Sequence, residues 1–348
     1  MISRRQLLQA ASVTTAQRAF ADTDRKLSPN LGGAPAGFPM RARAARAASK
    51  PFDFIEHCHN LGLGVVETRL DHRNPDAIRE FRNKTERWNM RAIVGTPLPR
   101  EQGDVPAYEA AVRAAKEAGV IGFHAAMTQR RYEQYDSLDA FRSDFERCQR
   151  SVALAEPVLR KYKLRLGIEN HKGWRAAEQA AWMKRLSSEW VGVHFDFGNN
   201  VALCEDPADT LRILRPYAIA CHIKDMAVEP YADGFLLSEV PLGDGFLDLK
   251  AMVQSLRGKD PNIPFNLEMI TRDPLNIPVY TERYWVTFDD SYSPMPARDL
   301  AKTLNIVRTK KPAYPLQRPS ALTEDAQLRL ENENIAKSIA CARTHLGL

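Results

Sequence analysis

The chain has few cysteines, few histidines and no long hydrophobic run. Its five cysteines are odd in number, widely spaced and never arranged as Cys-x-x-Cys, so we expect buried thiols rather than a disulfide framework or a zinc site. No apolar stretch approaches the roughly 18 residues of a membrane span. A glycine-rich phosphate cradle is also missing, which disfavours a phosphorylated substrate.

The excess of positive charge is small as well. The net charge of +6 includes Arg4, Arg5 and Arg18, which fall within the first 21 residues, and the remainder is too small to indicate binding to nucleic acid. With 44% hydrophobic and 26% charged residues among 348, the chain can bury one large core.

The first 21 residues are typical of a targeting segment. Arg4 and Arg5 precede a modest apolar stretch at residues 7–16, and Ala19-Phe20-Ala21 is a small-x-small cleavage pattern. The segment resembles a twin-arginine signal peptide, which predicts export to the periplasm by the Tat machinery. The alternative is a basic amphipathic helix that stays on a cytoplasmic protein.

Four polar residues each close a short apolar run. The runs LRLGIE, WVGVHFD, AIACH and PFNLE end on Glu169, Asp196, His222 and Glu268. Such runs are typical of buried parallel strands. A (β/α)8 barrel spends about 30 residues on each unit and carries its chemistry at the C-terminal ends of the strands. Because the first three residues recur at about that spacing, the pattern predicts a metal site at the mouth of a barrel.

Helical and strand patterns alternate along most of the chain. We expect helices at residues 52–61, 75–88, 105–118, 138–162, 176–186, 207–214 and 247–256. Further strands are expected at residues 64–68, 91–95 and 120–125, with the first strand near 36–44. This alternation predicts an α/β protein, a (β/α)8 TIM barrel with its core at residues 51–275. A poorly defined N-terminal segment, residues 22–50, precedes that core.

Two segments depart from the alternation. Residues 225–246 contain several prolines and glycines and predict an enlarged loop before the last barrel strand. Residues 276–348 predict a C-terminal loop and a helical extension, with helices at 298–308 and 324–345. The aromatic stretch 280–296 either packs on the barrel, covers its mouth or contacts a second subunit, so a homo-oligomer stays open.

Four motifs in order carry a family resemblance. The motifs GIENH, HFDFGN, HIKD and LEM resemble those of the xylose isomerase-like TIM barrel superfamily, in the branch of sugar isomerases and epimerases that includes ketose 3-epimerases. The likeness covers about residues 64–269. Matched motif by motif, it implies that Glu169, Asp196, His222 and Glu268 hold one divalent cation. It also implies that Glu169 and Glu268 exchange protons with opposite faces of a sugar.

The ligand types indicate the chemistry of this site. Three carboxylates and one imidazole make a hard, oxygen-rich set suited to Mn²⁺, with Mg²⁺, Co²⁺ or Zn²⁺ as alternatives. A cation that chelates a carbonyl and the neighbouring hydroxyl stabilises the enediolate formed when the α-proton leaves. We therefore expect a divalent-metal-dependent sugar isomerase or epimerase that acts on a ketose or related keto sugar, with Glu169 and Glu268 catalytic.

Other polar residues at strand ends are candidates for the rest of the site, because residues two apart on a strand face the same side. The expected substrate contacts are His171, Lys224, Glu67 and His124. The expected supports behind the metal ligands are His194 and Asn199. The motif His57-Cys58-His59 lies on a helical pattern, where residues two apart do not share a face, so we expect it to be structural.

Three alternatives use the same barrel. A lyase or dehydratase of 3-keto glycosides or keto-inositols forms the same enediolate but expels a β-substituent. A nuclease like endonuclease IV needs a histidine at the position where this chain has Asn199, which makes it a distant alternative. A sugar-binding barrel without catalysis is the third.

Overall fold

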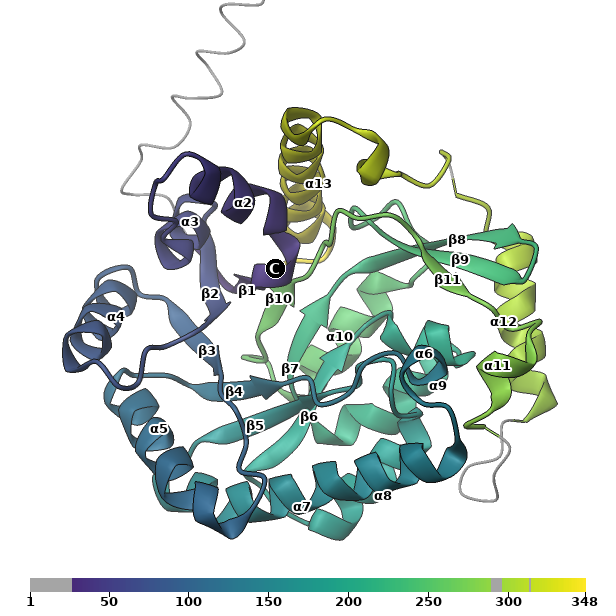
Figure 1. Cartoon of the computed structure of the whole chain (residues 1–348). Coiled ribbons are helices and arrows are strands. Elements are labelled where there is room, and N and C mark those ends of the chain that lie inside the picture. Colours follow the sequence, from purple (N-terminus) through teal and green to yellow (C-terminus); the bar gives the residue numbers. More distant parts are fainter. Residues whose placement is uncertain (1–26, 289–295, 313) are drawn as a thin grey trace, which may run out of the picture.

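The computed structural model describes residues 27–288, 296–312 and 314–348. Eight parallel strands close into a barrel in the order β1-β10-β7-β6-β5-β4-β3-β2, and helices surround it (Figure 1). These strands are β1 Ser28–Gly33, β2 Leu63–Thr68, β3 Arg91–Gly95, β4 Gly122–Ala125, β5 Arg165–Glu169, β6 Val191–Asp196, β7 Ala218–Ile223 and β10 Phe265–Leu267. The predicted (β/α)8 barrel with C-terminal helices is confirmed.

The helices follow the predicted pattern closely. They are α2 Pro39–Ala47, α3 Phe54–Asn60, α4 Pro75–Arg87, α5 Val105–Glu117, α6 Arg131–Gln134, α7 Leu138–Tyr162, α8 Ala176–Leu186, α9 Pro207–Leu214, α10 Leu249–Lys259, α11 Glu282–Trp285, α12 Ala297–Thr309 and α13 Glu324–His345. Side-chain caps explain several of the starts, since Ser137, Asp206 and Thr323 each accept a backbone N–H of the first turn.

The first strand lies earlier than its pattern predicted. The position at residues 36–44 is wrong, because those residues fall on a 3₁₀ turn and on α2, and β1 spans Ser28–Gly33. A Cβ on Gly32 would lie 2.2 Å from Asn266 Oδ1 of the neighbouring strand, so this position has no room for a side chain. Leu31 is the one large apolar residue of β1, so the sequence here has no hydrophobic run that would predict a strand.

The predicted enlarged loop at residues 225–246 contains a hairpin. Its strands β8 Asp225–Tyr231 and β9 Gly234–Val240 pair antiparallel, and β11 Leu275–Ile277 adds a third strand beside β9. The hairpin starts directly after β7, so it extends from the same end of the barrel as the predicted site. Asp225 fixes its return, because its Oδ2 accepts the backbone N–H groups of Gly243 and Gly245, each at 3.0 Å.

The C-terminal aromatic stretch packs on the barrel where it is described. Tyr284 is fully buried and stacks on Phe288, with ring centroids 5.2 Å apart. The buried guanidinium of Arg131 donates to Thr287 Oγ1 at 2.9 Å and lies 4.4 Å from the centre of the Phe288 ring. Packing thus accounts for these aromatics, whereas Tyr292 lies outside the described residues, as does the predicted signal at residues 1–21.

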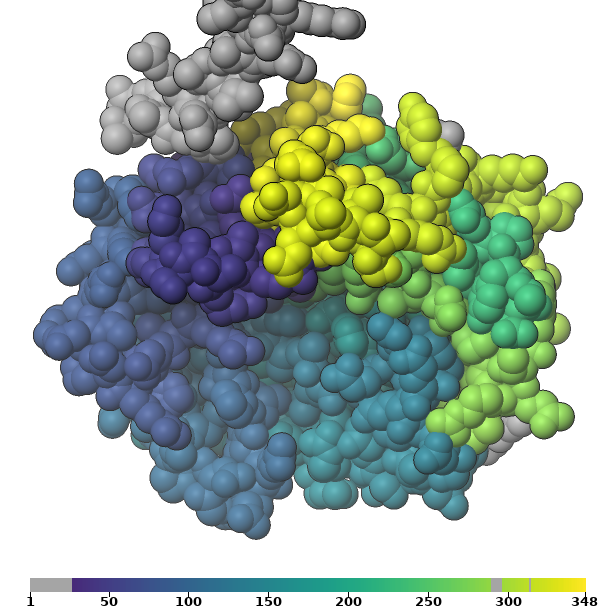
Figure 2. Space-filling view, turned by 45° about the horizontal axis from the view of Figure 1, so that its top comes forward, coloured from purple at the N-terminus to yellow at the C-terminus, as the bar shows by residue number. Residues whose placement is uncertain are grey.

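Helix α13 occupies the eighth helical position, after β10. The carboxylate of Glu331 accepts the backbone N–H groups of Met40 and Arg41 at the start of α2, at 2.7 and 2.9 Å. Figure 2 shows the yellow C-terminal residues against the purple residues with which the described chain begins, and β1 pairs with β10 to close the barrel. Over the described residues, none of the helices has the length and apolarity needed to cross a bilayer.

Candidate metal centre

Glu169, Asp196, His222 and Glu268, here called the quartet, converge at the C-terminal ends of four adjacent strands. Glu169 and Asp196 end β5 and β6, His222 lies one residue before the end of β7, and Glu268 follows β10. Parallel register aligns them, since Asp196 pairs directly with His222. One ligand atom from each residue lies within 4.8 Å of all the others. The fold therefore brings the four predicted ligands together at one end of the barrel.

The imidazole of His222 is the centre of the quartet. Its Nδ1 lies 3.8 Å from Glu169 Oε1, 3.9 Å from Asp196 Oδ2 and 3.6 Å from Glu268 Oε1. This Nδ1 has no hydrogen-bond partner among the described residues, although it is buried. A buried polar atom without a partner is costly, and a divalent cation bound by these three carboxylates and this imidazole would satisfy it. The residues present fit the implied metal.

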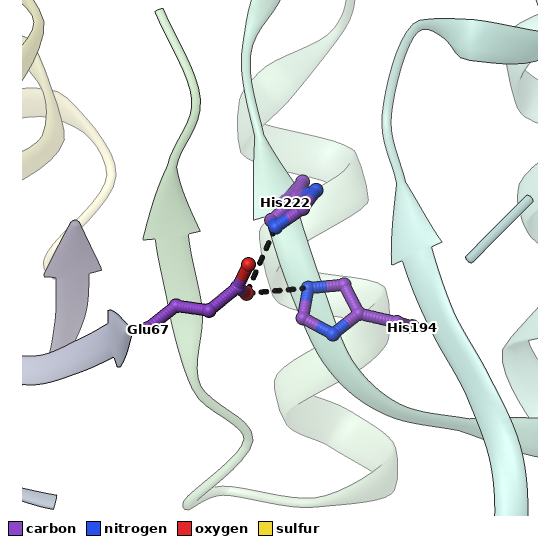
Figure 3. Close-up of side chains that lie close together, drawn as sticks. All are labelled: Glu67, His194 and His222. Atoms are coloured by element: carbon purple, nitrogen blue, oxygen red, sulfur yellow. Dashed lines mark hydrogen bonds and ion pairs between the residues drawn. The ribbon is translucent and has the colours of Figure 1, made fainter. Parts of the chain in front are cut away.

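The other ring nitrogen of His222, Nε2, contacts a carboxylate on the side of the ring away from the quartet. Its Nε2 lies 2.9 Å from Glu67 Oε2, and Figure 3 shows Glu67 reaching His222 and His194 from a separate strand. A carboxylate in this position fixes the ring and its tautomer, which leaves Nδ1 free to bind metal. The structure thus places Glu67 in an orienting position; its predicted contact with substrate stays a prediction.

His124 and His194 complete a group of three histidine rings behind the quartet. The His194 ring centroid lies 4.2 Å from that of His222 and 4.5 Å from that of His124. His124 bridges two glutamates, with Nδ1 3.0 Å from Glu67 Oε1 and Nε2 2.9 Å from Glu169 Oε2. Burial, aided by the charges of His222 and His124, holds the pKa of His194 well below its usual value, so this ring is neutral. The ring packs against His222, and its predicted role behind the metal ligands stays a prediction.

A neighbouring side chain donates a hydrogen bond to each glutamate of the quartet and holds its carboxylate in place. Asn199 donates its amide to Glu169 Oε1 at 2.7 Å, and Lys224 donates to Glu268 Oε2. Burial opposes ionisation of Glu169, but the charges of His171 and His222 and the hydrogen bond from His124 hold its pKa well below the usual range. Glu169 is therefore a carboxylate at neutral pH, ready to accept a proton.

Lys224 lies against the quartet itself. Its Nζ makes an ion pair with Asp196 Oδ2 at 2.7 Å in addition to its bond with Glu268. Burial disfavours the ammonium, but Asp196 and Glu268 outweigh that effect and raise the Lys224 pKa above its usual value. This side chain keeps its proton and neutralises part of the quartet's negative charge.

Comparison with known proteins identifies the family. The family described as "Xylose isomerase-like TIM barrel" matches residues 44–286, most of the barrel. The chain belongs to this family.

Two kinds of relatives stand out among known proteins. The chain is similar to the 3-oxo-isoapionate decarboxylase of Pectobacterium atrosepticum, with 30% identity over 31% of this chain, and it spans only 40% of that relative. Its fold matches a D-psicose 3-epimerase with a TM-score of 0.56 and 14% identity, over 92% of this chain and 100% of the other. It also matches a probable 3-DHS dehydratase from Bacillus anthracis, with a TM-score of 0.51 and 12% identity, over 75% and 100%. At these identities the two structures show a shared fold.

Within this xylose isomerase-like barrel, the remaining predicted contact is His171. Its Nδ1 lies 2.7 Å from the carbonyl oxygen of Thr128, to which it donates in the matching tautomer. Burial lowers the pKa of His171, and the negative charge of Glu169 opposes that shift. The structure places it after β5, in the electrostatic field of both Glu169 and Glu268.

Three charged residues near the quartet were missed by the sequence patterns. They are Lys172, Glu239 and Arg272. Glu239 comes from the hairpin and accepts a hydrogen bond from Arg272 Nε at 3.0 Å. Lys172 follows β5 and is 3% exposed. A lysine just after a strand is usually solvated, and a glutamate in a predicted loop gives no signal, so only the fold reveals them.

Proposed function

We propose that this protein is a divalent-metal-dependent isomerase or epimerase of a keto sugar. The supporting observation is the placement of its two glutamates. In the strand order β10-β7-β6-β5, Glu268 and Glu169 stand at the two ends of the quartet, and each turns one oxygen toward His222 Nδ1. Two carboxylates that flank one binding position can exchange protons with two sides of a bound sugar.

Glu169, Asp196, His222 and Glu268 would hold the cation, and the oxygen-rich set makes Mn²⁺ the first metal to test. When bound, the cation polarises a substrate carbonyl and stabilises the negative charge of the enediolate.

The protein's own groups supply the proton transfer. Glu169 and Glu268 are the proposed proton-transfer pair. Burial opposes ionisation of Glu268, but the charges of Lys224 and His222 lower its pKa, so this group also starts as a carboxylate. The glutamate that removes the α-proton becomes a carboxylic acid, which can return the proton to the neighbouring carbon in an isomerisation; in an epimerisation the opposite glutamate must first take a proton from solvent and then donate it to the other face. Lys224 orients Glu268 and Asn199 orients Glu169, which holds both carboxylates in position.

A lyase that forms the same enediolate is the second candidate. The decarboxylase among the curated relatives and the dehydratase among the structural neighbours favour this alternative. In a dehydratase, one glutamate would remove the proton and the β-hydroxyl would take up a proton and leave as water; in a decarboxylase, carbon dioxide would leave and a protonated glutamate would give a proton to the enediolate.

The test is proton exchange. The Mn²⁺-loaded protein is incubated in D₂O with ketoses and 3-keto glycosides and followed by NMR. We expect deuterium to enter a substrate whose carbon skeleton is retained, whereas loss of a substituent would establish the lyase. Glu268→Gln should abolish exchange, and the exposed Glu282→Gln serves as the control. Unchanged exchange in Glu268→Gln would overturn the assigned roles.

A further inference from the structure

Lys172 is a buried cation that lacks a carboxylate partner. Its side chain is 3% exposed, and its ammonium donates to the neutral amide oxygen of Asn199. In the parts of the chain that the structure describes, no ion pair joins Lys172 to an aspartate or glutamate. Burial and the charge of Lys224 lower the Lys172 pKa to about 8, which still leaves the group protonated at neutral pH.

The neighbouring cations differ in this respect. Lys224 is paired with Asp196 at 2.7 Å and with Glu268. Arg272 is paired with Glu239, with a hydrogen bond of 3.0 Å. Both charges are therefore neutralised by side chains of this protein, whereas among the described residues Lys172 bonds to the neutral amide of Asn199.

The charge balance at the quartet does not supply the missing partner. Its three carboxylates carry three negative charges, which a bound divalent cation and Lys224 together neutralise. The pair formed by Arg272 and Glu239 is neutral by itself. Once the metal is bound, the positive charge of Lys172 has no counterpart among these groups. Burying an ammonium ion without a counter-charge is costly, so a negative charge arriving with a ligand would be strongly favoured.

Lys172 is also close to the proposed reaction site. The Asn199 side chain that accepts its hydrogen bond donates in turn to Glu169 Oε1 at 2.7 Å. One amide group thus separates the Lys172 ammonium from a proton-transfer glutamate. In a ligand whose carbonyl lies at the quartet, an anionic group only a few covalent bonds from that carbonyl could reach Lys172.

We propose that the substrate is an acidic keto sugar, and that Lys172 binds its carboxylate. This inference rests on the proposed function, because it requires the keto end of the same molecule to lie at the metal-loaded quartet. An ammonium has three N–H donors, and the bond to Asn199 leaves two for a carboxylate. Its single charge matches a monoanion, whereas a phosphate dianion would leave one charge without a counterpart.

The experiment compares ligands that differ in one substituent. Binding of D-fructuronate, D-fructose and D-fructose 6-phosphate to the full-length, Mn²⁺-loaded protein is measured by calorimetry, and the comparison is repeated with D-tagaturonate and D-tagatose. We expect at least one acid to bind tenfold or more tightly than its neutral counterpart. Lys172→Gln keeps a donor for Asn199 but removes the charge, so the tenfold ratio between the affinities for acid and neutral ketose should disappear in this variant.

Controls separate the outcomes. The exposed Lys184→Met should retain the preference for the acid, and electron paramagnetic resonance of Mn²⁺ verifies that each variant holds metal. If Lys172→Gln fails to fold, Lys172→Met provides the second test. Equal binding of acid and ketose, or a preference that survives in Lys172→Gln, overturns the inference and leaves the proposed function standing. If D-fructose 6-phosphate binds most tightly, the proposal that Lys172 binds a carboxylate is rejected. Absence of binding by all of these ligands counts against the proposed function itself.

Discussion

At the scale of single residues, Glu67 shows how a side chain can act on a metal that it does not bind. It holds His222 Nε2 at 2.9 Å, which orients Nδ1 toward the quartet. We predict that Glu67→Ala weakens Mn²⁺ binding about 10- to 100-fold, as is typical when a partner of a ligand histidine is lost. Titration calorimetry of the variant measures this, with the exposed Glu117→Gln as the control. Unchanged affinity would mean that packing against neighbouring rings alone holds His222.

His57 illustrates a histidine with a structural role, as predicted for its motif. Its ring packs edge-on against Phe38, with ring centroids 5.3 Å apart, and burial together with the nearby charge of Arg41 lowers its pKa to about 4. The unfolded chain therefore binds this proton more readily than the folded protein does. The stabilising contribution is complete above about pH 6.5 and is lost as the pH falls through about 4.

The prediction is a difference between two pH profiles. Between pH 7 and pH 4, the free energy of unfolding of the natural protein should fall by about 2 kcal/mol more than that of His57→Gln, after allowance for partial exposure of the ring. Urea unfolding at a series of pH values measures both. Parallel profiles would show that the ring stays uncharged in the unfolded chain or charges freely in the folded one.

At the scale of elements, the sequence predicted those helices and strands whose signals lie within their own residues. Helices α7 and α13 begin and end at their predicted residues, and the hydroxyl of Ser137 or Thr323 caps the start of each. Strand β1 has no such signal, since Gly32 is required by contact with Asn266, a residue far along the chain. The hairpin was missed for a different reason, because its two strands pair locally but the prolines and glycines in residues 225–246 indicate a loop.

The same distinction applies to the site. Each quartet residue closes its own strand, so four local patterns sufficed to predict their convergence. Lys172 has no such pattern, because its significance depends on Asn199, Lys224 and Arg272, which lie on other elements. Charge balance at a barrel mouth is a property of the folded chain, and the sequence alone does not reveal it.

The return of the hairpin allows a direct test at this scale. A Cβ on Gly245 would lie 2.1 Å from Asp225 Oδ1 and 2.4 Å from the carbonyl oxygen of Met226. We expect Gly245→Ala to lower the free energy of unfolding by about 1–3 kcal/mol, because the carboxylate and the backbone must both move. Thermal and urea unfolding measure the change.

Gly258 in α10 is the matched control. Its nearest neighbour would be the Arg215 guanidinium at 3.8 Å, so Gly258→Ala meets no clash. Helix propensity should make that variant more stable by roughly 0.5–1 kcal/mol. If both alanine variants changed stability alike, the contact between Asp225 and the turn would not be what fixes the hairpin.

At the scale of the whole molecule, the quartet joins strands that span half of the barrel. The ligands come from β5, β6, β7 and β10, so a cation that binds all four stabilises only the closed fold. Mn²⁺ at 100 times its dissociation constant should therefore raise the free energy of unfolding by about 2.7 kcal/mol. Asp196→Asn should lose most of this gain, whereas the exposed Asp139→Asn should retain it. Urea unfolding in Mn²⁺ and in EDTA compares the three proteins. An equal gain in Asp196→Asn would place the stabilising cation away from the quartet, and the barrel would then close independently of the metal on which the proposed chemistry depends.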